Sequence, residues 1–165
     1  KKRKARMYAE VAGYAATSEA HHMVIPREDG EEVAITMRLA LKDAGVTPAQ
    51  VDYINAHATS TTVGDAVEVK AIRLLFKSRA DKLAVSATKS LVGHTLGAAG
   101  SLAGIVSALT LTSGQIHPTL NLDDPDPACD MDFIPKLART SDIEAALCNC
   151  LGFGSKNSAL VLGRA

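Results

Sequence analysis

The sequence has no tryptophan, few other aromatic residues and no excess of charge of either sign. Aromatic residues make up 4% of the 165 residues, and 18 basic residues balance 18 acidic ones. Proteins that bind single-stranded nucleic acid use aromatic side chains as stacking platforms, and nucleic-acid interfaces in general carry an excess of positive charge. The composition therefore argues against a nucleic-acid-binding protein.

Cysteines and long apolar runs are also scarce. Cys129, Cys148 and Cys150 have no spacing typical of a disulfide framework, which favours a reducing compartment, and we assign no metal site. The longest apolar tract, 96–112, is shorter than a membrane span and is interrupted by glycine and serine. The sequence thus predicts neither a disulfide-rich secreted protein nor a membrane protein.

Strand and helix patterns alternate along the chain without a linker, which predicts one α/β domain over residues 1–165. Residues 1–8 have the pattern of a helix end that runs into a strand. Strands are predicted at 7–17, 51–56, 83–87, 132–134, 145–150 and 158–162, and helices at 31–44, 65–76 and 97–112. Asp65 is a candidate helix cap. The last helix is apolar on nearly every face, so we expect it to be buried between layers, beside a mixed five-stranded sheet.

Two histidines are framed by small residues. His57 follows an apolar strand in YINAHATSTTVGD (53–65), and His94 lies in a glycine-rich turn in KSLVGHTLGAAG (89–100). Such frames bring two imidazoles to one buried point and leave room for a substrate. A converging pair favours general acid–base chemistry or the stabilisation of an oxyanion. The alternative is that both histidines are polar residues with structural roles at the ends of elements.

A third glycine-punctuated segment, NCLGFGSKN (149–157), lies between two apolar runs. In order, NAHATSTTVGD, KSLVGHTLGAAG and NCLGFGSKN resemble the three carboxyl-terminal motifs of the β-ketoacyl synthases. HHMVIP, TLNLDDPDPACDMDFIP and SALVLG are similar to further stretches of the elongating β-ketoacyl synthases of bacterial type II systems. The resemblance covers essentially the whole chain. It implies a thiolase-like layered fold, of which this chain would be the carboxyl-terminal half.

The resemblance also implies an activity, the decarboxylative Claisen condensation of an acyl thioester with malonyl acyl-carrier protein in fatty-acid elongation. It implies that His57 and His94 donate hydrogen bonds to the enolate and that Lys89 tunes this pair. Phe153 would supply one N–H of the acyl oxyanion hole and gate the acyl pocket with its ring. Thr59 and Thr61 would bind the phosphopantetheine arm, which the carrier protein brings, so no cofactor is assigned to this chain.

The nucleophilic cysteine of the family lies in an amino-terminal half, and none of the three cysteines here has its setting. We therefore expect this chain alone to be inactive. Its expected partners are that half, the acyl-carrier protein and a second copy in a homodimer, in the cytoplasm, or in the mitochondrial matrix or plastid of a eukaryote.

The sequence departs from the family pattern at several positions. Ala58 and Ser155 add side chains where glycine is usual, and Ala103 replaces a carboxylate that supports Lys89. These departures leave the loop geometry and the acyl-chain specificity open. The alternatives are a polyketide ketosynthase, its chain-length-factor subunit, or a structural or dimerisation half without activity. The joint presence of both histidines, Lys89 and Phe153 argues against the last.

Overall fold

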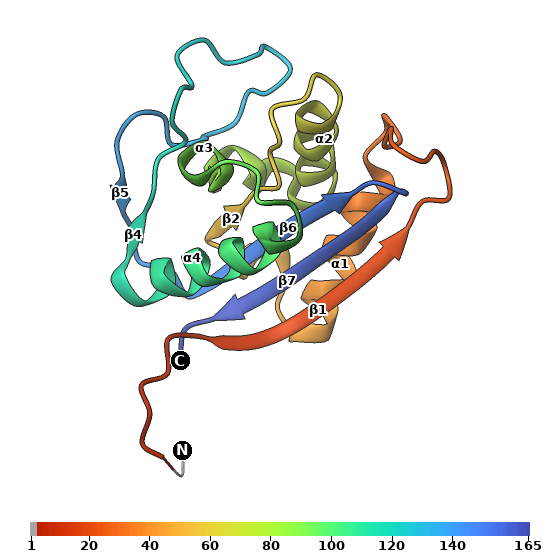
Figure 1. The fold of residues 1–165 in the computed structure, drawn as a ribbon. Coiled ribbons are helices and arrows are strands. Elements are labelled where there is room, and N and C mark those ends of the chain that lie inside the picture. Colours follow the sequence, from red (N-terminus) through yellow and green to blue (C-terminus); the bar gives the residue numbers. More distant parts are fainter. Residues whose placement is uncertain (1–2) are drawn as a thin grey trace.

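The computed structural model describes residues 3–165 and has one mixed five-stranded sheet (Figure 1). The strand order is β1 (Glu10–Ser18), β7 (Lys156–Gly163), β6 (Ala145–Gly152), β2 (Tyr53–Asn55) and β3 (Ala84–Ser86). The pairs β1–β7 and β7–β6 are antiparallel, whereas β6–β2 and β2–β3 are parallel. The predicted mixed five-stranded sheet is therefore confirmed.

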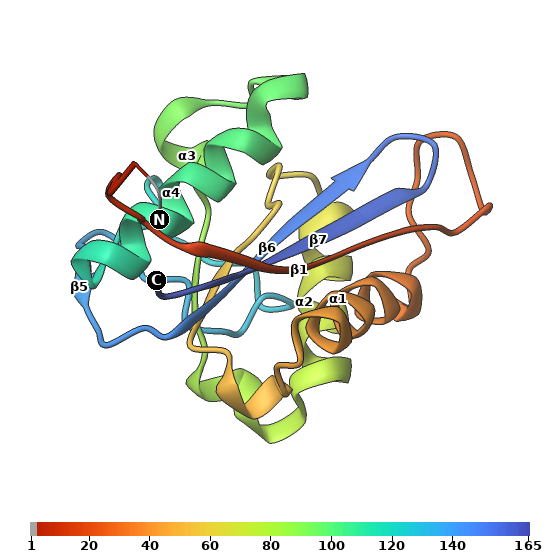
Figure 2. The same ribbon diagram turned by 90° about the horizontal axis from the view of Figure 1, so that it is seen from below.

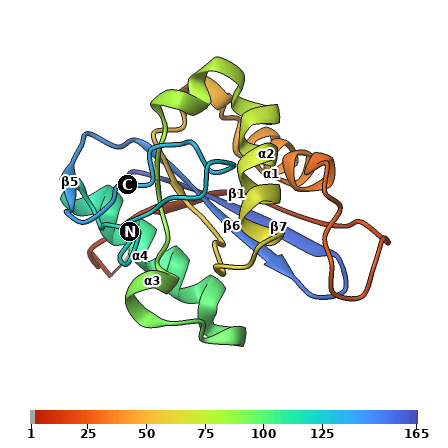
Figure 3. The same ribbon diagram turned by 90° about the horizontal axis from the view of Figure 1, so that it is seen from above.

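Helices cover the two faces of this sheet unequally (Figures 2 and 3). On one face lie α1 (Glu31–Ala44) and α2 (Gly64–Phe76), which with the sheet enclose a large apolar core around Met37, Ile54 and Ile72. On the other face lies α4 (Ala99–Ser113), over a smaller core that contains Tyr53 and Leu111. Successive residues of β2, such as Tyr53 and Ile54, thus point into different cores, as the alternation of a strand requires.

Short elements complete the fold. They are η1 (Pro48–Gln50), η2 (Lys77–Lys82), α3 (Lys89–Val92) and η3 (Leu96–Ala98), with β4 (Gln115–Ile116) and β5 (Arg139–Thr140) forming a separate two-stranded sheet. The strand β1 packs closely on α1 at Gly13, where an added Cβ would lie 2.5 Å from the carbonyl oxygen of Ala40. Only glycine fits this contact without a shift of the backbone.

The structure confirms most predicted elements and corrects several. The helix 31–44 is found with the predicted bounds and ends at Gly45, which is left-handed. The segment 132–134 is not a strand, because Ile134 has a positive φ and its N–H is taken by the Asp132 side chain. Lys1 and Lys2 of the predicted helix end lie outside the described residues, and the residues from Arg3 to the start of β1 form no helix.

Asp65 does not cap α2. It lies inside the first turn of the helix, and its Oδ1 instead accepts the backbone N–H groups of Ser60 and Thr61, at 3.1 and 3.4 Å. The carboxylate thus ties the helix to the loop that precedes it, which is the loop that follows His57.

The predicted apolar helix is present as α4, but it is buried on one face only. Ala103, Ser107 and Leu111 face the sheet, whereas Ile105 and Leu109 are 57% and 50% exposed. By length and composition, Leu96–Ser113 is apolar enough to cross a membrane, a test that core helices of soluble proteins also pass. The prediction that this tract is shorter than a membrane span is therefore wrong, because the glycines and serines in it add no charge and the helix extends to Ser113.

Candidate active site

The two framed histidines meet at one end of the sheet. His57 comes two residues after the end of β2, and His94 follows α3 in a turn that Gly93 makes with a φ of +75°. Their ring centroids are 5.8 Å apart and the rings are perpendicular. The prediction that the two imidazoles converge is confirmed.

Lys89, the first residue of α3, fixes which nitrogen of His57 carries a hydrogen. Its Nζ donates to the carbonyl oxygen of His57 at 2.6 Å and lies 3.3 Å from His57 Nδ1. An ammonium group has no acceptor, so Nδ1 accepts and the hydrogen of a neutral ring is on Nε2. His94 has the same tautomer when neutral, because its Nδ1 accepts the N–H of Leu96 at 3.2 Å. Both rings therefore present an Nε2–H donor.

Burial keeps His57 uncharged. Desolvation, with smaller contributions from Lys89 and His94, lowers the pKa of His57 to about 3. Burial also lowers the pKa of Lys89, and the nearby Glu68 carboxylate opposes this shift. The neutral His57 ring beside Lys89 can therefore donate a hydrogen bond without carrying a positive charge itself.

Glu68, which our sequence analysis missed, anchors the loop after His57. Its side chain projects from α2, the residue is 3% exposed, and its two oxygens accept the N–H groups of His57 and Ala58, both at 2.9 Å. Asn149 on β6 donates to the same carboxylate at 3.0 Å. Burial raises the pKa of Glu68. The signal in the sequence was a carboxylate inside the apolar run of a helix, where a charge is rare without a polar partner.

Glu68 also provides the carboxylate that Ala103 lacks. That alanine was expected to leave Lys89 without carboxylate support, but Glu68 supplies a negative charge from another helix. Ala58 is held by Glu68 at a φ of +35°, where glycine is ordinarily favoured. The loop thus keeps its left-handed backbone despite the added side chain.

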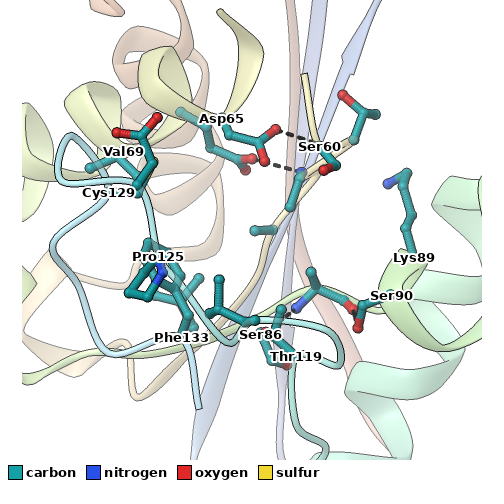
Figure 4. A pocket seen from close by; sticks show the side chains of 18 of the residues that line it. Ser60, Asp65, Val69, Ser86, Lys89, Ser90, Thr119, Pro125, Cys129 and Phe133 are labelled. Carbon is teal, nitrogen blue, oxygen red and sulfur yellow. Dashed lines mark hydrogen bonds between the residues drawn. The ribbon is translucent and has the colours of Figure 1, made fainter. Parts of the chain in front are cut away.

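The hydroxyl groups of Thr59 and Thr61 lie close together. Their hydroxyl oxygens are 3.4 Å apart, and Thr61 Oγ1 also accepts the N–H of Gly64 at 3.2 Å. Both threonines line a cavity of about 670 Å³, which Lys89 and His94 line as well. Figure 4 shows Lys89 on the α3 side of this cavity, across from Asp65 on α2. The Thr61 hydroxyl thus stabilises the local turn, and both threonine hydroxyls still line the cavity.

Phe153 lies in the turn between β6 and β7, and its side chain is 79% exposed. Ser155 fastens this turn to the segment before α1. Its Oγ donates to the carbonyl oxygen of His22 at 2.7 Å, and Gly154 N–H donates to that of Met23 at 2.6 Å. The role of Phe153 in the acyl oxyanion hole stays a prediction.

Two of the cysteines have surroundings that disfavour a thiolate. Cys148 is buried, and desolvation raises its pKa to about 11. Burial, followed by the nearby carboxylate of Asp126, raises the pKa of Cys129. A nucleophilic cysteine needs the opposite shift. These surroundings agree with packing roles for both.

This chain is similar to a known protein family and to several curated and solved proteins. The model of the family "Beta-ketoacyl synthase, C-terminal domain" matches residues 8–123. The 3-oxoacyl-[acyl-carrier-protein] synthase 2 of Coxiella burnetii is 46% identical over 99% of this chain and 40% of its own length. That of Vibrio harveyi is 46% identical over 98% of this chain and 39% of its own length. This chain therefore spans about 40% of the length of these relatives.

Two solved structures show the same fold. A type II PKS ketosynthase, bound to a hexaketide and in complex with its acyl-carrier protein, superposes with a TM-score of 0.97 at 36% identity, over 99% of this chain and 40% of that chain. A β-ketoacyl synthase of Burkholderia phymatum superposes with a TM-score of 0.93 at 37% identity, over 99% of this chain and 39% of that one.

Proposed function

The chain belongs to the β-ketoacyl synthase family, as its carboxyl-terminal domain, and we propose that it supplies the two-histidine half of an active site for fatty-acid elongation. The reaction is the decarboxylative Claisen condensation of an acyl thioester with malonyl acyl-carrier protein. The observation that carries the proposal is the pair of perpendicular imidazoles, 5.8 Å apart, that each present an Nε2–H.

The geometry suits the stabilisation of an enolate. When the malonyl carboxylate leaves as carbon dioxide, its bonding electron pair passes to the thioester and negative charge develops on the carbonyl oxygen. Nε2–H groups of His57 and His94 donate to this oxygen, while Lys89 keeps His57 in the required tautomer. One such donor is worth about 2.7–4 kcal/mol of transition-state stabilisation. The enolate carbon then attacks the acyl carbonyl, a carbon–carbon bond forms, and the cysteine thiolate of the amino-terminal half leaves.

Two further partners belong to this proposal. The acyl-carrier protein presents its phosphopantetheine arm to Thr59 and Thr61, whose hydroxyls lie together at the cavity. The amino-terminal half brings the cysteine and the second oxyanion N–H, and Phe153 brings the first. The names of the curated relatives, which are bacterial 3-oxoacyl-[acyl-carrier-protein] synthases, support the carrier as a partner. A cytoplasmic location is part of the same proposal. We also propose that the complete enzyme is a homodimer.

A polyketide ketosynthase is the second candidate. It is favoured by the superposition on the type II PKS ketosynthase, and the ishigamide ketosynthase/chain length factor superposes with a TM-score of 0.94 at 37% identity. The two functions share the condensation and differ in whether the β-keto product is reduced before the next round. Product analysis with excess malonyl carrier and no reducing enzymes separates them, because a polyketide enzyme extends its unreduced products again.

The test is a pair of substitutions in the full-length protein, His57→Ala and His94→Ala. Each should lower malonyl decarboxylation and condensation by about 10²–10³-fold. Formation of the acyl-enzyme should stay measurable, because it uses the cysteine and the backbone oxyanion hole. The control is His21→Ala, which changes an exposed histidine outside the cavity. Near wild-type condensation by both variants would refute the two-histidine mechanism.

A further inference from the structure

His117 lies behind the site and makes contacts that the mechanism above does not use. Its Nδ1 lies 2.9 Å from the carbonyl oxygen of Pro118, which can only accept, so Nδ1 carries the hydrogen. Nε2 of the neutral ring is then an acceptor. It lies 3.1 Å from the hydroxyl of Ser86, at the end of β3, and 3.1 Å from the hydroxyl of Thr88. Both hydroxyl residues are buried, and Thr88 directly precedes Lys89.

The residues after His117 hold the same turn. Thr119 Oγ1 accepts the N–H of Ala87 at 3.2 Å, and Leu120 N–H donates to Ser90 Oγ at 2.9 Å. Figure 4 shows Thr119 beside Ser86, with Ser90 at the α3 end of the same wall. The segment 117–120 thus contacts residues 86, 87, 88 and 90. These residues form the end of β3 and the turn in which Lys89 lies.

Thr88 also connects this turn to the strand that ends before His57. Its Oγ1 accepts from Asn55 Nδ2 at 2.8 Å, and Asn55 is the last residue of β2. The Thr88 hydroxyl has two acceptors at 3.1 Å, Asn55 Oδ1 and His117 Nε2, and its hydrogen can be shared between them. Thr88 thus joins the end of β2 to the ring of His117, whose Nδ1–H donates to the Pro118 carbonyl.

We propose that His117 is a positioning residue for the condensation: as the acceptor of the Thr88 and Ser86 hydroxyls, it fixes the turn from which Lys89 reaches His57. The inference rests on the proposed function and adds a residue to it. The distance from Lys89 Nζ to His57 Nδ1 is already 3.3 Å, so a small displacement of the turn breaks this contact. His57 then loses the donor that selects its Nε2–H tautomer.

The test uses the full-length protein with His117→Leu, which removes the acceptor and keeps an apolar side chain of similar size. We expect malonyl decarboxylation to fall about ten- to a hundredfold, the size of effect that a small misplacement of a catalytic group produces. Acyl-enzyme formation should be unchanged, because it does not use His57. A general loosening of the structure would lower both activities together, and that result would overturn the proposal.

Three variants sharpen the test. His117→Gln restores an acceptor and should recover decarboxylation to within about threefold of wild type. Gln115→Leu is the matched control, since Gln115 is on the same segment but its side chain donates to Thr140 in the small sheet. Thr88→Val removes the partner hydroxyl at constant shape. Its combination with His117→Leu should lose no more than the larger single loss, whereas additive losses would overturn the proposal.

A spectrum of the histidine ring nitrogens gives a readout that needs no activity. His117→Leu should shift the Nδ1 resonance of His57, because the Lys89 donor moves, and Gln115→Leu should leave it in place. An unshifted resonance overturns the role of His117. A wild-type protein with neither decarboxylation nor acyl-enzyme formation would instead refute the proposed function, and the spectrum would still decide the positioning.

Discussion

The two faces of the sheet differ in how completely this chain covers them. On the α1–α2 face, helix residues such as Met37, Ala40 and Ile72 are at most 1% exposed and meet the sheet in one continuous core. On the α4 face, the helix covers the sheet but nothing in the described chain covers the helix, so Ile105 and Leu109 face outwards. The α1–α2 face, which we call the complete face, thus forms a closed apolar core within this chain. The α4 face, which we call the open face, leaves apolar side chains of its helix exposed to solvent.

The candidate site lies at one end of the sheet and takes residues from the elements of both faces. His57 is anchored through Glu68, which comes from α2 on the complete face. Lys89 and His94 come from α3 and the turn after it, which lead into α4 on the open face. The pairing of the histidines therefore depends on the relative position of both layers, and a change in either should be felt at the site.

The largest effect is expected from a cavity in the complete face. Met37 is fully buried between α1 and the sheet, so Met37→Ala should lower the free energy of unfolding of this chain by about 2–5 kcal/mol. The measurement is denaturant unfolding. A loss below about 1 kcal/mol would mean that this core collapses around the deletion and is less rigid than the structure indicates.

At pH values slightly below 6.5, a smaller effect follows from the burial of His57. Its pKa is lowered from 6.5 to about 3 in the folded chain, so the folded state binds this proton less readily than the unfolded state does. The stabilisation linked to His57 is therefore fully present above pH 6.5 and is lost as the pH falls from 6.5 towards 3. Subtracting the pH profile of the unfolding free energy of His57→Gln from that of wild type isolates this contribution. Identical slopes in the two profiles would mean that His57 is solvated.

Periodicity and turn residues predicted much of this fold. The bounds of α1 follow from an apolar face closed by Gly45, and the short strands followed by His57 and by Lys89 were recognised from their apolar runs. Glu68 and His117 were not predicted as site residues, because their partners lie at least ten residues away in the sequence and no local pattern encodes such contacts. The open face of α4 was missed for another reason. A helix that is apolar all round indicates burial on both sides, and in the described chain only one side of α4 is covered.

The smallest change in the unfolding free energy of this chain is expected for substitutions on the exposed side of α4. The same substitutions distinguish the two faces of the sheet most clearly. Ile105 is exposed here, so Ile105→Glu should change the unfolding free energy of the chain by less than about 0.5 kcal/mol. In the full-length protein, where we propose that the amino-terminal half covers α4, the same glutamate would be buried without a partner. It should then cost several kcal/mol or prevent folding. Leu109→Glu, on the same exposed side of the helix, should behave alike, whereas Leu111→Glu should destabilise both proteins because Leu111 faces the sheet. If the full-length protein tolerates Ile105→Glu as well as this chain does, the amino-terminal half does not cover α4.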